Sequence, residues 1–233
     1  MTEIQLELID IRAGYGGIEV LHGVDLAVPV GKVMAILGPN GAGKTTTLMV
    51  AAGLHEATGG DVVVCGRRVN GASADTLARA GICMIPEGKG VFPNLTVREN
   101  LLMATFTGQS VSEVEAIAYD RFPRLGERRG QTAGTLSGGE QQMLAMARAL
   151  TSDPAMLILD ELSMGLAPII VEQLYGLVAD LAATGVSILL VEQFATAALS
   201  VADLAAIMVH GRIRSVGTPH AIESELSDAY LGG

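Results

Sequence analysis

A short glycine-rich segment, Gly38–Thr46, limits the possible folds of this chain more than any other feature. It reads GPNGAGKTT and lies between the apolar run VMAIL and a helix-like stretch. Glycines let successive backbone N–H groups turn inward, and the N-terminus of the next helix adds positive potential, so the pattern predicts a polyphosphate site. In such a loop the lysine contacts the outer phosphates and the hydroxyl that follows binds Mg²⁺. The residues expected at this site are Gly38, Asn40, Gly41, Ala42, Gly43, Lys44, Thr45 and Thr46.

The length and the apolar runs indicate an α/β domain with a buried, mostly parallel sheet. A chain of 233 residues is long enough for one domain with a sizeable core. The runs VMAIL, AMLIL and VSILLV are short and unbroken, which is typical of parallel strands covered on both faces. Although the mean hydropathy is +0.43, no apolar stretch approaches the roughly 18 to 20 residues that a membrane span needs.

The charge and the cysteines restrict the partners and the compartment. A net charge of −10 disfavours non-specific binding to nucleic acid and to anionic lipid heads. Cys65 and Cys83 stand alone without metal-ligand spacing, and the stretch MTEIQLELID lacks the pattern of an export signal. We therefore expect a cytoplasmic protein without a structural metal site.

A second segment, Ala155–Glu161, supplies the acidic residues that a phosphate loop requires. It reads AMLILDE, an apolar strand that ends in two carboxylates. Ligands gather at the carboxyl ends of strands in open α/β sheets, so Asp160 is expected to hold Mg²⁺ through water. Glu161 is then placed to polarise an attacking water as a general base.

Two other classes with this type of loop find little support in the chain. Guanine recognition usually needs an Asn-Lys-x-Asp segment, and no asparagine here is followed by lysine. A small-molecule kinase needs a lid with several arginines and a second substrate pocket; the pair Arg128–Arg129 could belong to such a lid, but nothing else in the sequence supports it.

The segment Leu136–Gln142 separates the remaining possibilities. It reads LSGGEQQ, in which Ser137 and Glu140 have the spacing of a capping box that opens a helix. A cap does not need the glycine pair Gly138–Gly139, whose exposed N–H groups at a helix N-terminus would form a second anion site. Two phosphate-binding surfaces on one chain can serve one nucleotide when two chains face each other.

With these segments in place, the sequence resembles the ATP-binding cassette (ABC) family. LSGGEQQ is similar to its signature motif, GPNGAGKTT to its Walker A loop and AMLILDE to its Walker B strand, in family order from Tyr15 to Gln193. The resemblance implies a head-to-tail dimer that closes on two ATP molecules, with Tyr15 stacked on adenine. Each site would take Lys44, Thr45, Asp160 and Glu161 from one subunit and Ser137 and Gly139 from the other.

Three positions depart from the commonest pattern of the family. Glu87 stands where glutamine is usual, Ala167 where aspartate is usual and Gln193 where histidine is usual. One interpretation is a degenerate cassette that does not hydrolyse ATP.

The other interpretation is that these residues are typical of one subgroup of the family, and do not indicate a loss of activity. Several segments are similar to the shorter ATPase subunit of branched-chain amino acid importers and their amide and urea relatives: PEG, VFPNLTVRENL, SMGLAP, LLVEQ and AYLGG. That subgroup carries glutamate and glutamine at the positions of Glu87 and Gln193. Phe194 differs from the asparagine expected in that subgroup. On this interpretation, which we favour, Glu87 and Gln193 assist Glu161 in catalysis, and Glu87 joins Thr45 and Asp160 at Mg²⁺.

The expected architecture is a single α/β domain over residues 1–233. It has a P-loop NTPase core with a mostly parallel sheet, an N-terminal antiparallel β subdomain and an inserted helical subdomain. The boundaries are placed at about residues 1–92 and 153–233 for the core and about 93–152 for the helices.

The resemblance implies the ATP-hydrolysing subunit of a transporter as the function, with ATP and Mg²⁺ bound. The chain has no room for the long coiled coil of chromosome-maintenance ATPases and no second cassette like the ribosome-associated ones. Expected partners are a second ABC ATPase subunit, identical or different, transmembrane permease subunits and, indirectly, a solute-binding protein, but no nucleic acid. The subunit would lie at the inner face of the cell membrane. Branched-chain amino acids, urea and short amides all fit as cargo, export stays possible, and the alternative is a soluble regulatory ATPase that clamps a protein partner.

Overall fold

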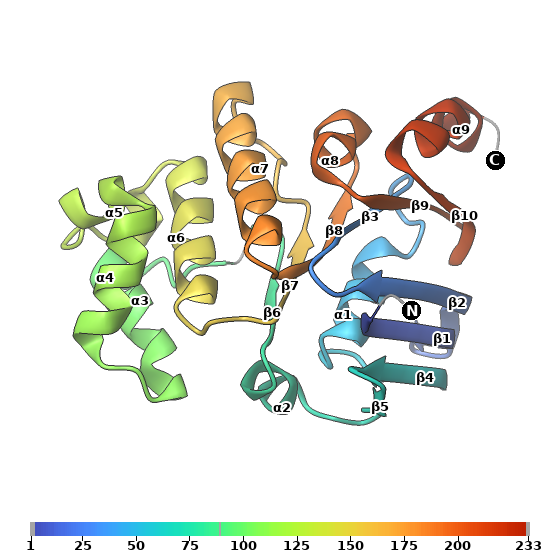
Figure 1. Cartoon of the computed structure of the whole chain (residues 1–233), viewed down its shortest axis with the longest axis horizontal. Helices are drawn as coiled ribbons and strands as arrows, with labels where there is room; N and C mark the ends of the chain where they lie inside the picture. Colours follow the sequence, from blue (N-terminus) through green and yellow to red (C-terminus); the bar gives the residue numbers. More distant parts are fainter. Residues whose placement is uncertain (1–2, 89, 232–233) are drawn as a thin grey trace.

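Two β-sheets carry the fold, and helices flank the larger of them (Figure 1). The computed structural model describes residues 3–88 and 90–231. From the resemblance we expect the loop Glu87–Pro93 to meet the membrane partner. Lys89 of this loop and the last two residues of the AYLGG segment lie outside the described residues. The strands are β1 (Ile4–Tyr15), β2 (Ile18–Pro29), β3 (Val33–Leu37), β4 (Gly59–Val64), β5 (Arg67–Arg68), β6 (Ile82–Ile85), β7 (Met156–Asp160), β8 (Ser187–Glu192), β9 (Leu204–Val209) and β10 (Arg212–Gly217).

The larger sheet has the order β10-β9-β3-β8-β7-β6. All of its pairings are parallel except that of β10 with β9, as the unbroken apolar runs predict. In register, Leu37 at the end of β3 lies opposite Glu192 at the end of β8, and Asp160 at the end of β7 lies opposite Val191. The loop after β3 and the acidic residues after β7 therefore leave the sheet at the same edge.

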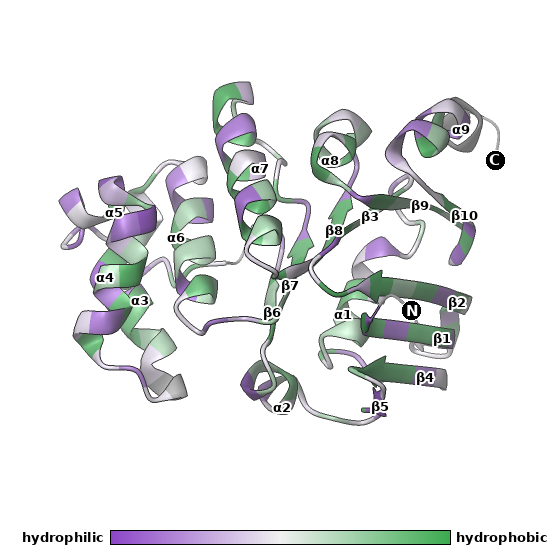
Figure 2. Ribbon diagram, in the orientation of Figure 1, coloured by the Kyte–Doolittle hydropathy of each residue, from purple (hydrophilic) through white to green (hydrophobic). Residues whose placement is uncertain are grey.

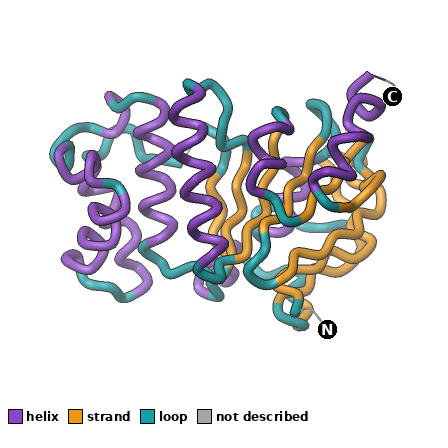
Figure 3. Tube along the Cα trace, turned by 45° about the horizontal axis from the view of Figure 1, so that its top comes forward, coloured by secondary structure: helices purple, strands orange, loops and turns teal. Residues whose placement is uncertain are grey.

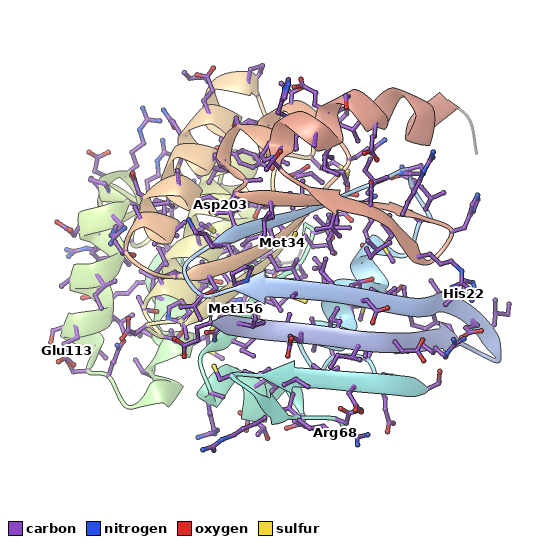
Figure 4. The ribbon with its side chains drawn as sticks, turned by 45° about the vertical axis from the view of Figure 1, so that its right-hand side comes forward. His22, Met34, Arg68, Glu113, Met156 and Asp203 are labelled. Carbon is purple, nitrogen blue, oxygen red and sulfur yellow. The ribbon has the colours of Figure 1, made fainter. Side chains whose placement is uncertain are left out.

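The residues of β3 alternate between two hydrophobic cores, because successive side chains of a strand point to opposite faces. Met34 and Ile36 pack with β1, β2, β4 and helix α1 (Lys44–Ala51) on one face, where Met156 of β7 joins them (Figure 4). Val33, Ala35 and Leu37 pack on the other face with residues of the helices that follow β6 in the chain, among them Leu101, Leu144 and Leu174. A strand buried on both faces cannot alternate in polarity, which explains why VMAIL is apolar throughout.

The smaller sheet has the order β2-β1-β4-β5, with every pairing antiparallel. Its long strands alternate buried and exposed residues over much of their length, since one face covers the core and the other faces solvent. This sheet is the predicted N-terminal antiparallel subdomain. Figure 2 shows the hydrophobic residues concentrated along the strands of both sheets.

The helices between β6 and β7 group at the end of the molecule away from the smaller sheet (Figures 1 and 3). The α-helices are α1 (Lys44–Ala51), α2 (Ala74–Arg79), α3 (Val97–Leu102), α4 (Val111–Arg121), α5 (Pro123–Glu127), α6 (Gly138–Leu150), α7 (Pro168–Ala183), α8 (Ala195–Val201) and α9 (Pro219–Leu231), with 3₁₀ turns η1 (Met103–Thr107) and η2 (Ala133–Thr135). We propose that residues 93–152 form a helical subdomain between the two parts of the core, 1–92 and 153–233. Within the described residues, no helix is long and apolar enough to cross a membrane.

Candidate functional site

The glycine-rich loop after β3 fits tightly against its neighbours. A Cβ atom at Gly38 would lie 2.2 Å from the carbonyl oxygen of Met208, so a larger residue would displace backbone. Gly43 has φ +105°, and a Cβ there would lie 2.9 Å from a methyl carbon of Leu21. Glycine is therefore required at both positions, and the loop curls between β9 and β2 before α1 begins at Lys44.

Lys44 lies folded back into this loop. Its side chain is 5% exposed, and Nζ donates to the carbonyl oxygens of Gly38 (2.9 Å) and Pro39 (3.2 Å). The same nitrogen lies 4.0 Å from Oε1 of Glu161. Burial lowers the pKa of Lys44, while the carboxylates of Glu161, Asp160 and Glu192 oppose this change. The loop thus holds a partly desolvated cation among groups that a phosphate can replace.

The side chain of Asp160, at the C-terminal end of β7, contacts that of Thr45 in α1. Thr45 Oγ1 donates to Oδ1 of Asp160 over 3.3 Å, and Asp160 is 4% exposed. Burial raises the pKa of Asp160 to about 6, with Glu161 and Glu87 adding to the rise and Thr45 and Lys44 opposing it. A buried carboxylate beside a hydroxyl, surrounded by further negative charge, is a donor set that fits Mg²⁺. In residues 3–88 and 90–231 no cluster of three or more His, Cys, Asp or Glu side chains could hold a metal alone, so phosphate and water oxygens would complete the shell.

Glu161 adopts an unusual backbone conformation. Its φ is +46°, in the left-handed region that residues other than glycine rarely occupy. Its N–H donates to the carbonyl oxygen of Val191 over 3.0 Å, which anchors the residue to β8. Burial raises the pKa of Glu161, Glu87 and Glu192 add to the rise, and Lys44 opposes it. A carboxylate with a raised pKa accepts a proton more readily, which suits a general base.

Glu87 and Gln193 approach this edge from two different strands. Glu87 is exposed just after β6, and its charge raises the pKa of both Asp160 and Glu161. Gln193 is half-buried and follows the last residue of β8. The topology therefore brings both residues to the end of the sheet that carries Asp160, while their catalytic roles stay predictions.

Tyr15 ends β1 and is 46% exposed. Its ring stacks on that of His55, with the centroids 4.3 Å apart, and its hydroxyl lies 3.7 Å from Sδ of Met49 in α1. His55 in turn bonds the carbonyl oxygen of Gly14 through Nε2. One face of Tyr15 is thus covered within the chain, a contact for which the isolated histidine in the sequence gave no signal.

Ser137–Gly139 begin helix α6 away from the phosphate loop. The Ser137 hydroxyl donates to Oε2 of Glu140 (2.8 Å) and accepts the Glu140 N–H (3.4 Å), so the expected capping box is present. A Cβ at Gly139 would lie 2.6 Å from Cγ2 of Ile170. Gly138 lines a small hollow with residues of the Glu87 loop and of the turn after β7. The structure does not bring this segment to the phosphate loop of its own chain through any hydrogen bond or ion pair between described residues.

Sequence reasoning also missed Glu192. This carboxylate ends β8, is 1% exposed and bonds Ser163 and Tyr175. The available signal was an acidic residue at the end of an otherwise apolar strand, the same signal that marked Asp160.

Comparisons with known proteins agree with this geometry. The family model described as ABC transporter matches residues 21–163. The chain is 44% identical to the high-affinity branched-chain amino acid transport ATP-binding protein BraG of Pseudomonas aeruginosa, over 94% of this chain and 96% of the relative. It is 38% identical to the probable branched-chain amino acid transport ATP-binding protein LivF of Archaeoglobus fulgidus, over 93% of each. A solved nucleotide-free ATP-binding cassette from an ABC transporter has a TM-score of 0.86 at 27% identity, covering 97% of this chain and 96% of that one.

Proposed function

The chain belongs to the ABC transporter family, and from this premise we propose that it is the ATP-hydrolysing subunit of an importer for branched-chain amino acids or related small polar solutes. The observation that carries the proposal is the convergence of Lys44, Thr45, Asp160 and Glu161 at one edge of the sheet. The names of the two relatives, BraG and LivF, support the class of cargo.

Each residue of the cluster has one role in this proposal. Bound ATP supplies the phosphoryl bond that water cleaves, and Mg²⁺ neutralises charge on its phosphates. Lys44 exchanges its loop carbonyls for outer phosphate oxygens, and the Thr45 hydroxyl and the Asp160 carboxylate hold the metal. Glu161 accepts the proton of the attacking water, helped by the burial that raises its pKa. Glu87 and Gln193 orient groups at the same edge. Tyr15 stacks the ring face that His55 does not cover on the adenine of ATP.

A second ATPase subunit completes the site. Gly138 and Gly139 begin α6 with N–H groups that have no i−4 acceptor, and Ser137 is exposed beside them. Facing a second chain, these groups would reach the phosphates that the partner's loop holds. Whether the partner is a copy of this chain or a related one decides only the symmetry of the pair.

The partner on the membrane side would dock in an apolar groove beside the Glu87 loop. The groove runs between α2, β6, η1 and α6. Three apolar side chains around it are more than 40% exposed: Leu54, Phe92 and Met103. Within it, the Arg148 guanidinium stacks on Phe92, 5.0 Å from the ring centroid. Exposed apolar side chains gathered around a groove are typical of a protein contact, and we assign this one to a permease segment, which would hold the subunit at the inner face of the membrane.

The test is Mg²⁺-dependent hydrolysis by the purified subunit with its permease chains. Glu161→Gln should reduce turnover by roughly 10²- to 10⁴-fold and leave ATP binding intact, because it removes a proton acceptor and no phosphate contact. Glu172→Gln, an exposed position on α7, is the matched control and should hydrolyse ATP normally. Unchanged hydrolysis in Glu161→Gln would remove that residue from the mechanism, and an inactive wild-type complex would favour the degenerate cassette.

The cargo is tested in the same preparation reconstituted with its solute-binding protein. We expect leucine, isoleucine or valine to stimulate hydrolysis. Stimulation by urea or acetamide alone would move the assignment to the amide and urea relatives.

A further inference from the structure

The carboxylate of Glu192 is buried, and the proposed function assigns it no role. Its Oε1 accepts the Ser163 N–H (3.0 Å) and the Tyr175 hydroxyl (2.5 Å), and its Oε2 accepts the Ser163 hydroxyl (2.8 Å). At 1% exposure, this carboxylate has exchanged its water for three protein donors. Such a fully donor-lined pocket fits an acceptor and is costly to leave unfilled.

These bonds hold the turn that carries Glu161. The Glu161 N–H donates to the carbonyl oxygen of Val191, and two residues later the Ser163 N–H donates to the side chain of Glu192. The Met164 N–H closes the turn on the Glu161 carbonyl oxygen over 3.3 Å. Two consecutive residues at the end of β8, Val191 and Glu192, therefore hold the turn through hydrogen bonds to Glu161 and Ser163.

These hydrogen bonds are needed because Glu161, the first residue of the turn, has an unfavourable backbone conformation. Glu161 has φ +46°, and such a conformation persists at a residue other than glycine only where the surroundings over-determine it. Without the bonds to Ser163 the turn would be free to relax toward commoner backbone angles. The Glu161 carboxylate would then leave its place 4.0 Å from Lys44 Nζ.

Tyr175 connects the same carboxylate to helix α7. Its side chain is 4% exposed, and burial raises its pKa, with the charge of Glu192 adding to the rise, so the phenol remains a donor at neutral pH. Helix α7 begins at Pro168, four residues after Met164 at the end of the turn. One carboxylate thus fixes the turn, the helix after it and the strand beneath it relative to one another.

We propose that Glu192 is a positioning residue for ATP hydrolysis, which holds the turn Glu161–Met164 so that the Glu161 carboxylate faces the phosphate loop. The proposal rests on the proposed function, because it assigns Glu161 as the base. Glu192 acts through Ser163 and the backbone, and it does not touch the nucleotide.

Replacement by glutamine separates geometry from charge. A glutamine carbonyl at the Oε1 position can accept from the Ser163 N–H and from Tyr175, while its NH₂ group donates to the Ser163 hydroxyl, which can also accept. Glu192→Gln should therefore keep kcat within about 3-fold of the wild type, since its hydrogen bonds survive. Glu192→Ala removes every acceptor and should reduce kcat by roughly 10- to 100-fold with KM changed less than about 3-fold, because the base is misplaced while ATP contacts remain.

Two further variants show whether the effect passes through Glu161. In a Glu161→Gln background, adding Glu192→Ala should not lower the residual rate further, since the group that it positions is already gone. Asp203→Ala is the matched control, because its carboxylate accepts the Val33 N–H (2.9 Å) and the Lys32 ammonium (2.8 Å) at the opposite end of the sheet. It should lower the thermal midpoint and leave kcat unchanged.

The proposal is overturned if folded Glu192→Ala hydrolyses ATP at the wild-type rate, or if Glu192→Gln is as slow as Glu192→Ala, which would make charge the active property. Should Glu192→Ala not fold, Ser163→Ala and Tyr175→Phe each delete one donor. Each should then slow kcat at unchanged KM, and wild-type kcat in both would overturn the proposal equally. An inactive wild type refutes the proposed function itself, whereas an active wild type with an inactive Glu161→Gln and a normal Glu192→Ala refutes only the positioning role.

Discussion

The phosphate loop and the segment Ser137–Gly139 both lie at a helix N-terminus, yet they are built in opposite ways. In the first, side chains from distant strands converge: Thr45 bonds Asp160, which is 115 residues away in the chain, and Lys44 lies 4.0 Å from Glu161. In the second, the Ser137 side chain is engaged by Glu140, three residues away.

Local geometry does not distinguish Ser137 from an ordinary helix cap. Ser110 with Glu113 at α4, and Thr96 with Glu99 at α3, form the same capping box. What sets α6 apart is the glycine pair after the serine, of which Gly138 is exposed and Gly139 is packed against Ile170. The phosphate loop has counter-charges within its own chain. We propose that Ser137–Gly139 is half of a site, which its cap satisfies until a second chain binds.

Among the variants that test this comparison, the largest effect is expected in the phosphate loop, whose groups all come from one chain. Lys44→Ala should weaken ATP binding by roughly 10- to 100-fold, because it deletes a charge-assisted phosphate contact. Lys32→Ala is the matched control, since Lys32 precedes the same strand and pairs with Asp203 at the other end (2.8 Å). Titration with a fluorescent ATP analogue measures both. Equal affinities for the two variants would contradict the assignment of the loop.

The segment Ser137–Gly139 is tested by comparing the variant Ser137→Arg with Ser110→Arg, which changes the N-cap of α4. Both variants lose a capping box and should lose a similar free energy of unfolding, about 1 kcal/mol. Only Ser137→Arg should abolish cooperative ATP hydrolysis and the ATP-dependent dimer, because the arginine occupies the surface that faces the other chain. Denaturant unfolding, gel filtration and rate against ATP concentration give the three readouts. Retained cooperativity in Ser137→Arg would show that the sites are not shared.

The smallest expected effect concerns pH and Asp160. Its pKa of about 6 lies above the usual value for aspartate, so the folded state binds a proton more readily than the unfolded state does. The stabilisation from that proton is present below pH about 4 and is lost as pH rises through about 6. For the nucleotide-free protein without Mg²⁺, we expect this group to lower the free energy of unfolding by on the order of 1 kcal/mol between pH 5 and 7.

Asp160→Asn should remove this loss, so that the variant gains stability over the wild type as pH rises. Urea unfolding at pH 5, 6 and 7 measures the difference. Parallel pH profiles for the two proteins would show that Asp160 is not the group responsible.

Much of the fold was predictable because its signals are local. Unbroken apolar runs predicted buried parallel strands, alternation predicted the smaller antiparallel sheet, and the spacing of Ser137 and Glu140 predicted the cap of α6. The resemblance to the ABC family is confirmed by the family model and by relatives covering nearly the whole chain. The roles of Tyr15, Glu87 and Gln193 stay predictions, since no described contact reports on a nucleotide.

The sequence by itself determined the local elements of the site: the glycine-rich loop, the helix that begins at Lys44 and Thr45, and the strand that ends in Asp160. The tertiary structure decided which distant groups meet, including Thr45 with Asp160, Tyr15 with His55, and Glu192 with Ser163 and Tyr175. The physical reason is that spacing along the chain encodes a loop or a helix face. The order β9-β3-β8-β7 of the strands, which brings those side chains together, comes from packing the whole sheet between two cores.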